Sequence, residues 1–468
     1  MKFLRISFRS QMSAFALLAA LCTSPAFSQE VLGEYEEQII HYETGNPLRD
    51  PVAQLQGKLD SGVANLKFDA ERGFLPDLLR ALRVPTSSQT LVFSKTSSQR
   101  AHTSPHTPRA LYFNDEVSVG WAPGTEVIDL AAIDPERGTI FYTLEQRSNA
   151  PPRFARRNDC LQCHFGPKTI NVPGWLVRSV YTDSSGKPLG NVEGFVGGHN
   201  SPIETRWAGW YVTGNAGEAR HLGNLFAKDV NSIEPSVSIT PSDLIELERG
   251  FDTRRYLSTG SDVVALLVLE HELRMQNLIT YASYETRYAL AEWAQSEWGR
   301  GAVDLQLCSV TSLEPGETRG EPAGASIHSD WPRQRIALAG EMLLEYMLFR
   351  NEAPLRGPVR GSSDFTTQFQ VAGPRTPDGR SLRELDLHTH LFKYPCSFLI
   401  YSPAFDALPR PMKEYLWQRL AQILRGQERT GIYASMSNED RRNILEILLE
   451  TKPEFAEWSN ENRRKQSY

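Results

Sequence analysis

The chain has 468 residues, a formal net charge of −6, 23% charged residues and 40% hydrophobic residues. This mild charge argues against a nucleic-acid partner, and the composition is that of an ordinary globular protein. The length allows two or three packed units or one large, elaborated domain.

The N-terminus has the pattern of a secretory signal peptide. Basic residues precede a short apolar run, and small residues follow it up to Ser28. We expect cleavage after Ser28, so that residues 1–28 are the signal peptide and the mature chain is periplasmic. A lipoprotein acylated at Cys22 is disfavoured because Leu21 stands where a small residue is wanted. An uncleaved anchor is disfavoured because the apolar run is too short to span a bilayer.

The first half of the mature chain is predicted to be rich in strands. A short amphipathic helix is expected over 75–82, and β-prone runs broken by turn residues follow it. The expected strands lie at 91–94, 110–113, 116–121, 127–130, 139–142, 175–181 and 209–212. A loop over 151–170 interrupts the series, because prolines precede it and Gly166-Pro167 ends its central part.

The second half is predicted to be mainly helical. A long helix is expected from Asp262 to about Ala294, and stretches rich in Pro and Gly mark linkers. Further helices are expected at 333–348, 412–425 and 439–450, with linkers at 314–324 and 353–379. The fold class is therefore α+β, with a β-rich region over 29–255 and a mainly helical region over 256–468 packed on it.

The loop at 151–170 contains Cys160-Leu161-Gln162-Cys163-His164. This CxxCH pattern resembles the haem-attachment site of c-type cytochromes. The resemblance implies one covalent haem c, with Cys160 and Cys163 bonded to the porphyrin and His164 as the proximal iron ligand. Predicted export supports it. A structural disulfide or a redox dithiol is the alternative, whereas zinc would need more ligands than the chain places nearby.

The resemblance is limited to the motif. Small c-type cytochromes place an amphipathic helix before the motif and a methionine several tens of residues after it. Here a predicted strand precedes the motif, and no methionine occurs between His164 and Met275. We therefore do not expect the minimal all-α cytochrome c fold.

Three histidines are candidates for the distal iron ligand or the distal pocket. His199 lies in a glycine-rich loop, His221 follows a predicted strand, and His271 lies on the buried stripe of the long helix. Met275 is a weaker option on the same stripe. An open sixth position is the remaining alternative, and it would allow a small ligand to bind the iron.

Other side chains suggest supporting roles. Arg156 and Arg157 are candidate contacts for the haem propionates, because a guanidinium pairs well with a carboxylate; ordinary surface charge is the alternative. Cys308 and Cys396 are a possible disulfide in an exported protein, or else two buried free thiols.

The expected function is electron transfer by a periplasmic monohaem c-type protein, with a redox partner protein or a small electron donor or acceptor. The first alternative is a haem enzyme, peroxidase-like or another oxidoreductase, with an open iron site. A haem sensor or binding protein is the second. The chain is far longer than one electron-transfer haem requires, which favours the enzyme; the single haem motif favours electron transfer.

Overall fold

The structure is a computed structural model of residues 1–468, and it describes residues 32–190, 194–225, 247–248, 250–295, 331–428 and 431–465. The expected signal peptide, the linker at 314–324 and Cys308 lie outside these residues.

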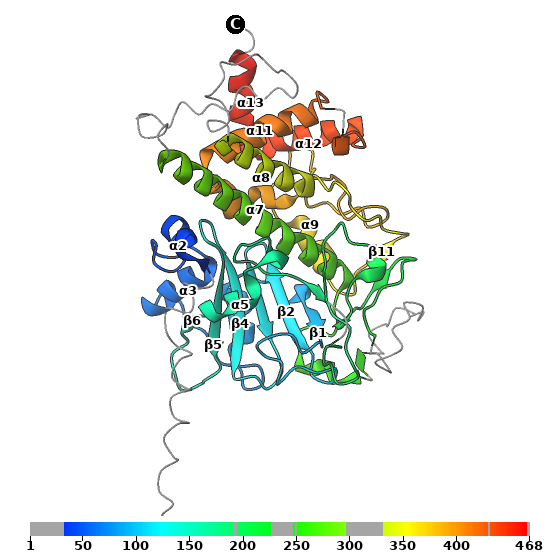
Figure 1. The fold of residues 1–468 in the computed structure, drawn as a ribbon. Helices are drawn as coiled ribbons and strands as arrows, with labels where there is room; N and C mark the ends of the chain where they lie inside the picture. The colour runs from blue at the N-terminus through cyan, green and yellow to red at the C-terminus, as the bar shows by residue number, and fades with distance from the viewer. Residues whose placement is uncertain are drawn as a thin grey trace, which may run out of the picture.

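A seven-stranded antiparallel sheet forms the lower half of the molecule (Figure 1), in the order β6-β5-β4-β3-β2-β1-β9. The strands are β1 Thr90–Val92, β2 Arg109–Asn114, β3 Val117–Trp121, β4 Val127–Asp134, β5 Gly138–Glu145, β6 Phe154–Arg156 and β9 Trp210–Tyr211. Side-chain caps close two of its turns. Asn114 Oδ1 accepts from the backbone N–H of Val117 at 2.9 Å, and Asp134 Oδ1 accepts from that of Arg137 at 3.0 Å.

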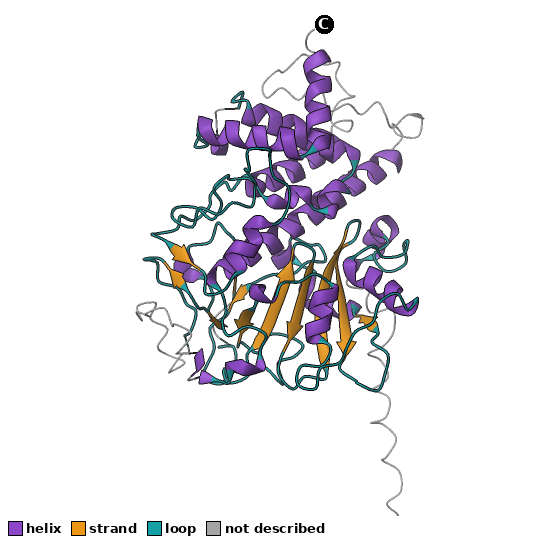
Figure 2. Cartoon of the chain, turned by 180° about the vertical axis from the view of Figure 1, so that it is seen from behind, coloured by secondary structure: helices purple, strands orange, loops and turns teal. Residues whose placement is uncertain are grey.

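The two faces of this sheet have different neighbours (Figure 2). One face packs against α3 (Pro51–Asp60), whose N-cap Asp50 accepts a hydrogen bond of 2.7 Å from the Tyr142 hydroxyl of β5. The other face bears the alternate residues of β2 to β5 and lies beneath α5 (Leu161–His164). Helices α2 (Glu34–Ile40) and α4 (Leu75–Ala81) complete the N-terminal part.

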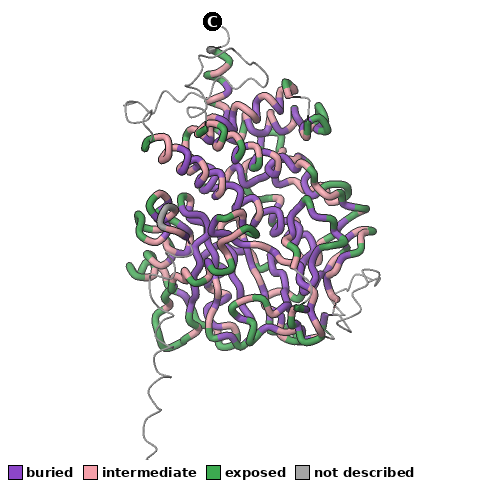
Figure 3. Tube along the Cα trace, in the orientation of Figure 1, coloured by how far each residue is buried: buried purple, intermediate pink, exposed green. Residues whose placement is uncertain are grey.

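A single long helix, α7 (Val263–Gln295), joins the sheet to the helical half. It crosses the end of the sheet at the β2–β3 and β4–β5 turns. Gln276 Nε2 donates to the Asp115 carbonyl at 2.7 Å, and the Tyr284 hydroxyl donates to the Arg137 carbonyl at 2.9 Å. Most of the helix is buried (Figure 3), because the sheet lies on one side and other helices on the other.

The helical half stacks on α7 above the sheet (Figure 1). It comprises α8 Trp331–Met347, α9 Phe365–Val371, α10 Pro403–Asp406, α11 Arg410–Leu424, α12 Asn438–Thr451 and α13 Pro453–Lys465. Two small antiparallel ribbons pair β7 Arg178–Ser179 with β8 Phe195–Val196, and β10 Asn215–Ala216 with β11 Val359–Arg360. One hydrophobic cluster runs through both halves. Among the described residues, no helix is both long and apolar enough to cross a bilayer.

The α+β class is confirmed: strands dominate the first half and helices the second. The long helix, expected over 262–294, is observed as α7. The strand expected over 175–181 is reduced to the two residues of β7. Backbone groups of Trp175 pair instead with the Asn277 side chain of α7, so this segment does not join the main sheet.

The burial of α7 predicts a clear contrast between two Leu→Ala variants. Leu266 of α7 is fully buried, whereas Leu338 of α8 is 70% exposed. We expect Leu266→Ala to lower the free energy of unfolding by about 2–5 kcal/mol, because it leaves a cavity in the core. Leu338→Ala should change it by no more than about 0.5 kcal/mol. Urea unfolding followed by circular dichroism measures both, and equal losses would contradict the arrangement of α7.

Candidate functional site

The CxxCH motif forms one compact helical turn. A 3-10 helix, η2 (Asn158–Cys160), leads directly into α5. Both thiols are free; Cys163 is exposed and Cys160 is partly buried. Burial, reinforced by the nearby negative charge of Asp159, raises the pKa of the Cys160 thiol to about 12. A redox-active dithiol needs a thiolate of lowered pKa, so this environment does not favour that alternative.

The ring of His164 is held in one tautomer. Its Nδ1 lies 3.0 Å from the carbonyl oxygen of Gly174. A carbonyl only accepts, so Nδ1 carries the proton and Nε2 keeps its lone pair. Burial lowers the pKa of His164, which keeps the ring neutral. Nε2 makes no hydrogen bond with the described residues, and this is the state that a metal-ligating histidine requires.

A side chain of α7, that of Asn277, fixes the position of the Gly174 carbonyl through the next residue. The Asn277 side chain accepts from the Trp175 backbone N–H at 3.3 Å and donates to the Trp175 carbonyl at 2.9 Å. Gly174 also donates its N–H to the His164 carbonyl at 2.9 Å. A Cβ on Gly174 would lie 2.4 Å from Asn277 Oδ1, so this close approach requires glycine. Asn277 therefore positions the histidine ring through Gly174, a role that the sequence pattern did not reveal.

A cavity of about 380 Å³ lies between α5, the sheet and α7. Cys160, Cys163 and His164 border it together. The sheet contributes its floor, Trp175 to Val177 form one wall, and α7 closes it with Leu269 and Leu273. The cavity also reaches the exposed Gln162. Its size falls within the range of small-molecule and cofactor sites.

The floor of this cavity consists of side chains from one face of the sheet. Leu111 lies opposite Gly120 and Gly120 opposite Asp129, while Ala131 lies opposite Phe141. The Phe141 ring packs against that of His164, with centroids 4.8 Å apart. The floor is thus apolar beneath the histidine and charged towards Asp129.

The charged end contains a pair of residues that the sequence did not single out. Arg109 Nη2 lies 3.3 Å from Asp129 Oδ2, and both side chains are largely buried. Arg109 shares the sheet face of Leu111, and this alternation was the available signal.

The two arginines predicted to contact the haem propionates, Arg156 and Arg157, lie in different surroundings. Arg157 borders the cavity and forms an ion pair with Asp159, whereas Arg156 points away and donates to the Tyr42 carbonyl at 2.6 Å.

The structure brings two of the three candidate distal histidines together, but not at His164. His199 Nδ1 and His271 Nδ1 are 2.9 Å apart, and His271 Nε2 lies 2.8 Å from Ser397 Oγ. The His199 ring also stacks on that of Tyr346. His221 lies elsewhere, edge-on to Trp207. None of the three histidines is among the described residues that border the cavity.

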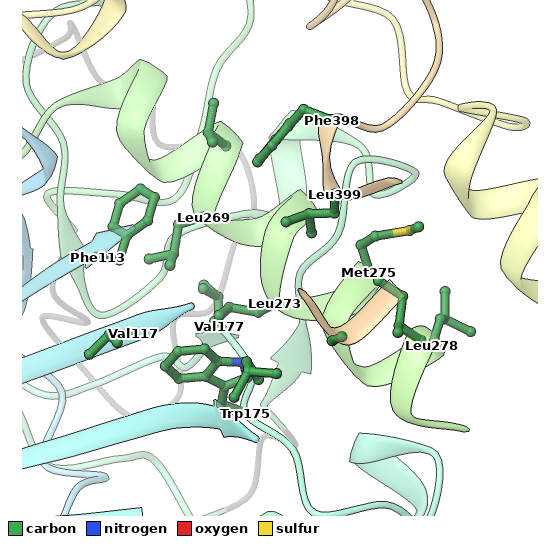
Figure 4. Close-up of a cluster of buried hydrophobic side chains, with 14 of the residues drawn as sticks. Phe113, Val117, Trp175, Val177, Leu269, Leu273, Met275, Leu278, Phe398 and Leu399 are labelled. Carbon is green, nitrogen blue, oxygen red and sulfur yellow. The ribbon is translucent and has the colours of Figure 1, made fainter. Parts of the chain in front are cut away.

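The geometry of α7 explains this separation. Leu269 and Leu273 face the cavity, and His271 lies two residues from each. Two residues correspond to about 200° around a helix, so His271 faces the helical half instead. Figure 4 shows Leu273 beside Trp175 and Val177, with Met275 on the other side of the helix. The buried stripe that predicted a ligand is therefore part of the helix–helix core.

We compared the chain with known proteins in three ways, and no protein-family model, no curated protein and no solved structure matches it.

Within the described residues, no group of three or more His, Cys, Asp or Glu side chains is placed to hold a metal ion. Cys396 is buried in the helical half; since Cys308 lies outside the described residues, the disulfide between them stays a prediction.

The buried histidines predict a specific acid sensitivity. Burial lowers the pKa of His271 to about 3. The unfolded chain takes up this proton near pH 6.5, whereas the native protein takes it up only near pH 3. The contribution of neutral His271 to the free energy of unfolding is therefore fully present above pH 6.5, and it is lost as the pH falls below this value. Between pH 7 and pH 5, His271 should contribute a loss of about 2 kcal/mol.

Urea titrations at pH 7 and pH 5 test this. The loss on acidification should be about 2 kcal/mol smaller in His271→Gln than in the wild type. His102, which is solvent-exposed, provides the control for the substitution itself, and His102→Gln should change the free energy of unfolding at pH 7 by no more than about 0.5 kcal/mol. A His271→Gln curve parallel to that of the wild type would show that His271 is not a buried neutral base.

Proposed function

We propose that this chain is an exported monohaem c-type protein, in which Cys160 and Cys163 bond the porphyrin and His164 is the proximal iron ligand. One observation carries the proposal: both thiols and the histidine border the same cavity, and the histidine is held as the Nδ1–H tautomer. Nε2 is the nitrogen that a haem iron would take. A bound haem would supply iron that changes oxidation state and binds small ligands.

The residues around the cavity fit such a group. Leu269, Leu273 and Phe141 would provide apolar contacts for a porphyrin, and Arg100, Arg109 and Arg157 at the cavity border would be able to pair with its carboxylates. The Gly174 carbonyl accepts from His164 Nδ1 and so raises the basicity of Nε2. With haem bound, the chain would supply attachment, orientation and an apolar wall, which are the protein's part in cofactor chemistry.

The cavity lining favours an open sixth position. Among the described residues that border it, His164 is the one histidine, and neither methionine nor lysine occurs. These residues therefore supply no second histidine and no methionine or lysine, and a bound haem would be able to take up a small ligand. This feature moves our proposal from pure electron transfer towards a haem-dependent oxidoreductase.

Electron transfer remains a second candidate function, because one observation favours it. Cys163 is exposed, so the porphyrin edge bonded to it would lie at the protein surface. A redox partner protein or a small donor or acceptor could then exchange electrons at this edge. The expected periplasmic location suits both functions, since covalent attachment of haem c takes place after export.

Covalent attachment is the first prediction to test. Wild-type protein, produced in cells with c-type maturation, should carry the mass of one haem after denaturation and give a pyridine haemochrome spectrum. Cys160→Ala/Cys163→Ala should lose both signals. Cys396→Ala removes a buried thiol distant in sequence from the motif, and it should keep them. Wild-type protein without a covalent haem would refute the proposal.

The resting spin state tests the open position. We expect the ferric protein to be high-spin, because no described cavity residue provides a second strong ligand. His199→Ala, His221→Ala and His271→Ala should leave the absorption spectrum unchanged. A low-spin spectrum in the wild type that becomes high-spin in one of these variants would identify that histidine as the distal ligand and favour electron transfer alone.

A further inference from the structure

The charged end of the cavity contains hydrogen-bond donors that the chain does not use. Arg109 makes one hydrogen bond there, of 3.3 Å, to Asp129. Its Nε is buried and has no partner among the described residues. A guanidinium carries five N–H donors, so most of those on Arg109 are free to bind an anion of matching shape. A buried donor without a partner is costly, so a hydrogen-bond acceptor that enters the cavity would be favoured beside Arg109.

The local structure is built around this guanidinium. It lies against Gly120 in the middle of β3, where an added Cβ would be 1.9 Å from Arg109 Nη2. Gln99 Nε2 donates to the Gly120 carbonyl at 3.0 Å and so anchors the loop between β1 and β2 beside the guanidinium. Ser98, which precedes Gln99 in that loop, donates its hydroxyl to Asp129. The Asp129 carboxylate therefore accepts hydrogen bonds from both Ser98 and Arg109. Arg109 is fixed by this contact but keeps N–H donors that have no partner among the described residues.

A second cation lies at this end of the cavity. Arg100 follows Gln99 in the anchored loop, borders the cavity and is exposed, with no side-chain partner among the described residues. The other charges on the wall form the pairs Arg109–Asp129 and Arg157–Asp159. One positive charge is left over. This surplus and the unused guanidinium donors together favour an anionic group with oxygen acceptors.

We infer that Arg109, assisted by Arg100, binds a carboxylate group inside the cavity. This inference rests on the proposed function when the carboxylate is a propionate of the haem, which is the source that we favour. A free small carboxylate, acting as a substrate, would use the same donors. The planar fork of Arg109 suits a carboxylate because it offers two parallel N–H groups. Arg156, the earlier candidate, has its guanidinium on Tyr42 instead.

The test compares Arg109→Gln with Arg156→Gln in the holoprotein. Glutamine removes the charge and keeps a polar side chain of moderate length. With a propionate as the ligand, Arg109→Gln should shift the propionate bending bands in the resonance Raman spectrum. It should also lower the midpoint potential, because a nearby positive charge disfavours the oxidised iron. Arg156→Gln should change neither.

A second variant separates the contact from the charge. Gly120→Ala keeps Arg109 but forces its guanidinium aside, because the new Cβ would occupy its position. It should shift the same Raman bands, and the result also holds if Arg109→Gln fails to fold. Arg109→Lys, which retains the charge without the fork, should restore the potential more fully than the Raman bands.

The free carboxylate is tested with acetate. If this is the source, acetate should raise the thermal unfolding temperature of the wild type saturably and that of Arg109→Gln not at all, with unchanged Raman bands. Either pattern supports the carboxylate site. Unchanged bands, potential and acetate response in Arg109→Gln would overturn it. If the wild type carries no covalent haem, the proposed function fails, and the acetate experiment alone then decides on Arg109.

Discussion

The hydrogen bond from His164 Nδ1 to the Gly174 carbonyl is the constraint on which the candidate site depends. It selects the tautomer that leaves the lone pair on Nε2, and it ties the end of α5 to the next loop. The acceptor is positioned because Asn277 pairs with both backbone groups of Trp175. A residue in the helical half thereby determines the orientation of a ring in the strand-rich half. The two halves are parts of one site.

The sheet face that forms the cavity floor carries both apolar and charged side chains. An apolar group needs the dry surface that Phe141 and Ala131 provide, and charged groups need partners when they are buried. The Arg109–Asp129 pair confines its charges to one end of the floor, where Ser98 adds a further hydrogen bond. Gly120 makes this possible, since any larger residue would displace the guanidinium. The absence of a side chain at Gly120 therefore determines where the Arg109–Asp129 ion pair can lie.

The sequence predicted the fold class and most of the elements well, because strand alternation and helical periodicity are local signals. The meander from β2 to β5 and the helix α7 follow directly from such patterns. The motif at 160–164 was equally visible, since its meaning depends on the spacing of five adjacent residues. The haem that it implies stays a prediction until covalent attachment is measured.

The rest of the site depends on contacts between distant segments, which periodicity does not encode. His271 lies on a buried stripe, but α7 is buried on several sides, so the stripe did not reveal which partner it faces. Arg156 and Arg157 are neighbours in sequence, yet successive residues point in different directions, and one of the two reaches the cavity. Arg109 and Asn277 were missed because their partners lie in other elements: Arg109 pairs with Asp129 two strands away in the sheet, and Asn277 pairs with Trp175, 102 positions earlier.

The closing wall of the cavity comes late in the chain. The floor and the motif belong to residues before 178, whereas Leu269 and Leu273 stand on a helix that begins at Val263. A pocket assembled from such separated segments forms slowly during folding, because the intervening loop must close first. A chain that emerges N-terminus first therefore presents Cys160 and Cys163 on an uncovered sheet before α7 arrives. Docking of the helix then completes the cavity wall, and the finished cavity still reaches the protein surface at Gln162 and Cys163.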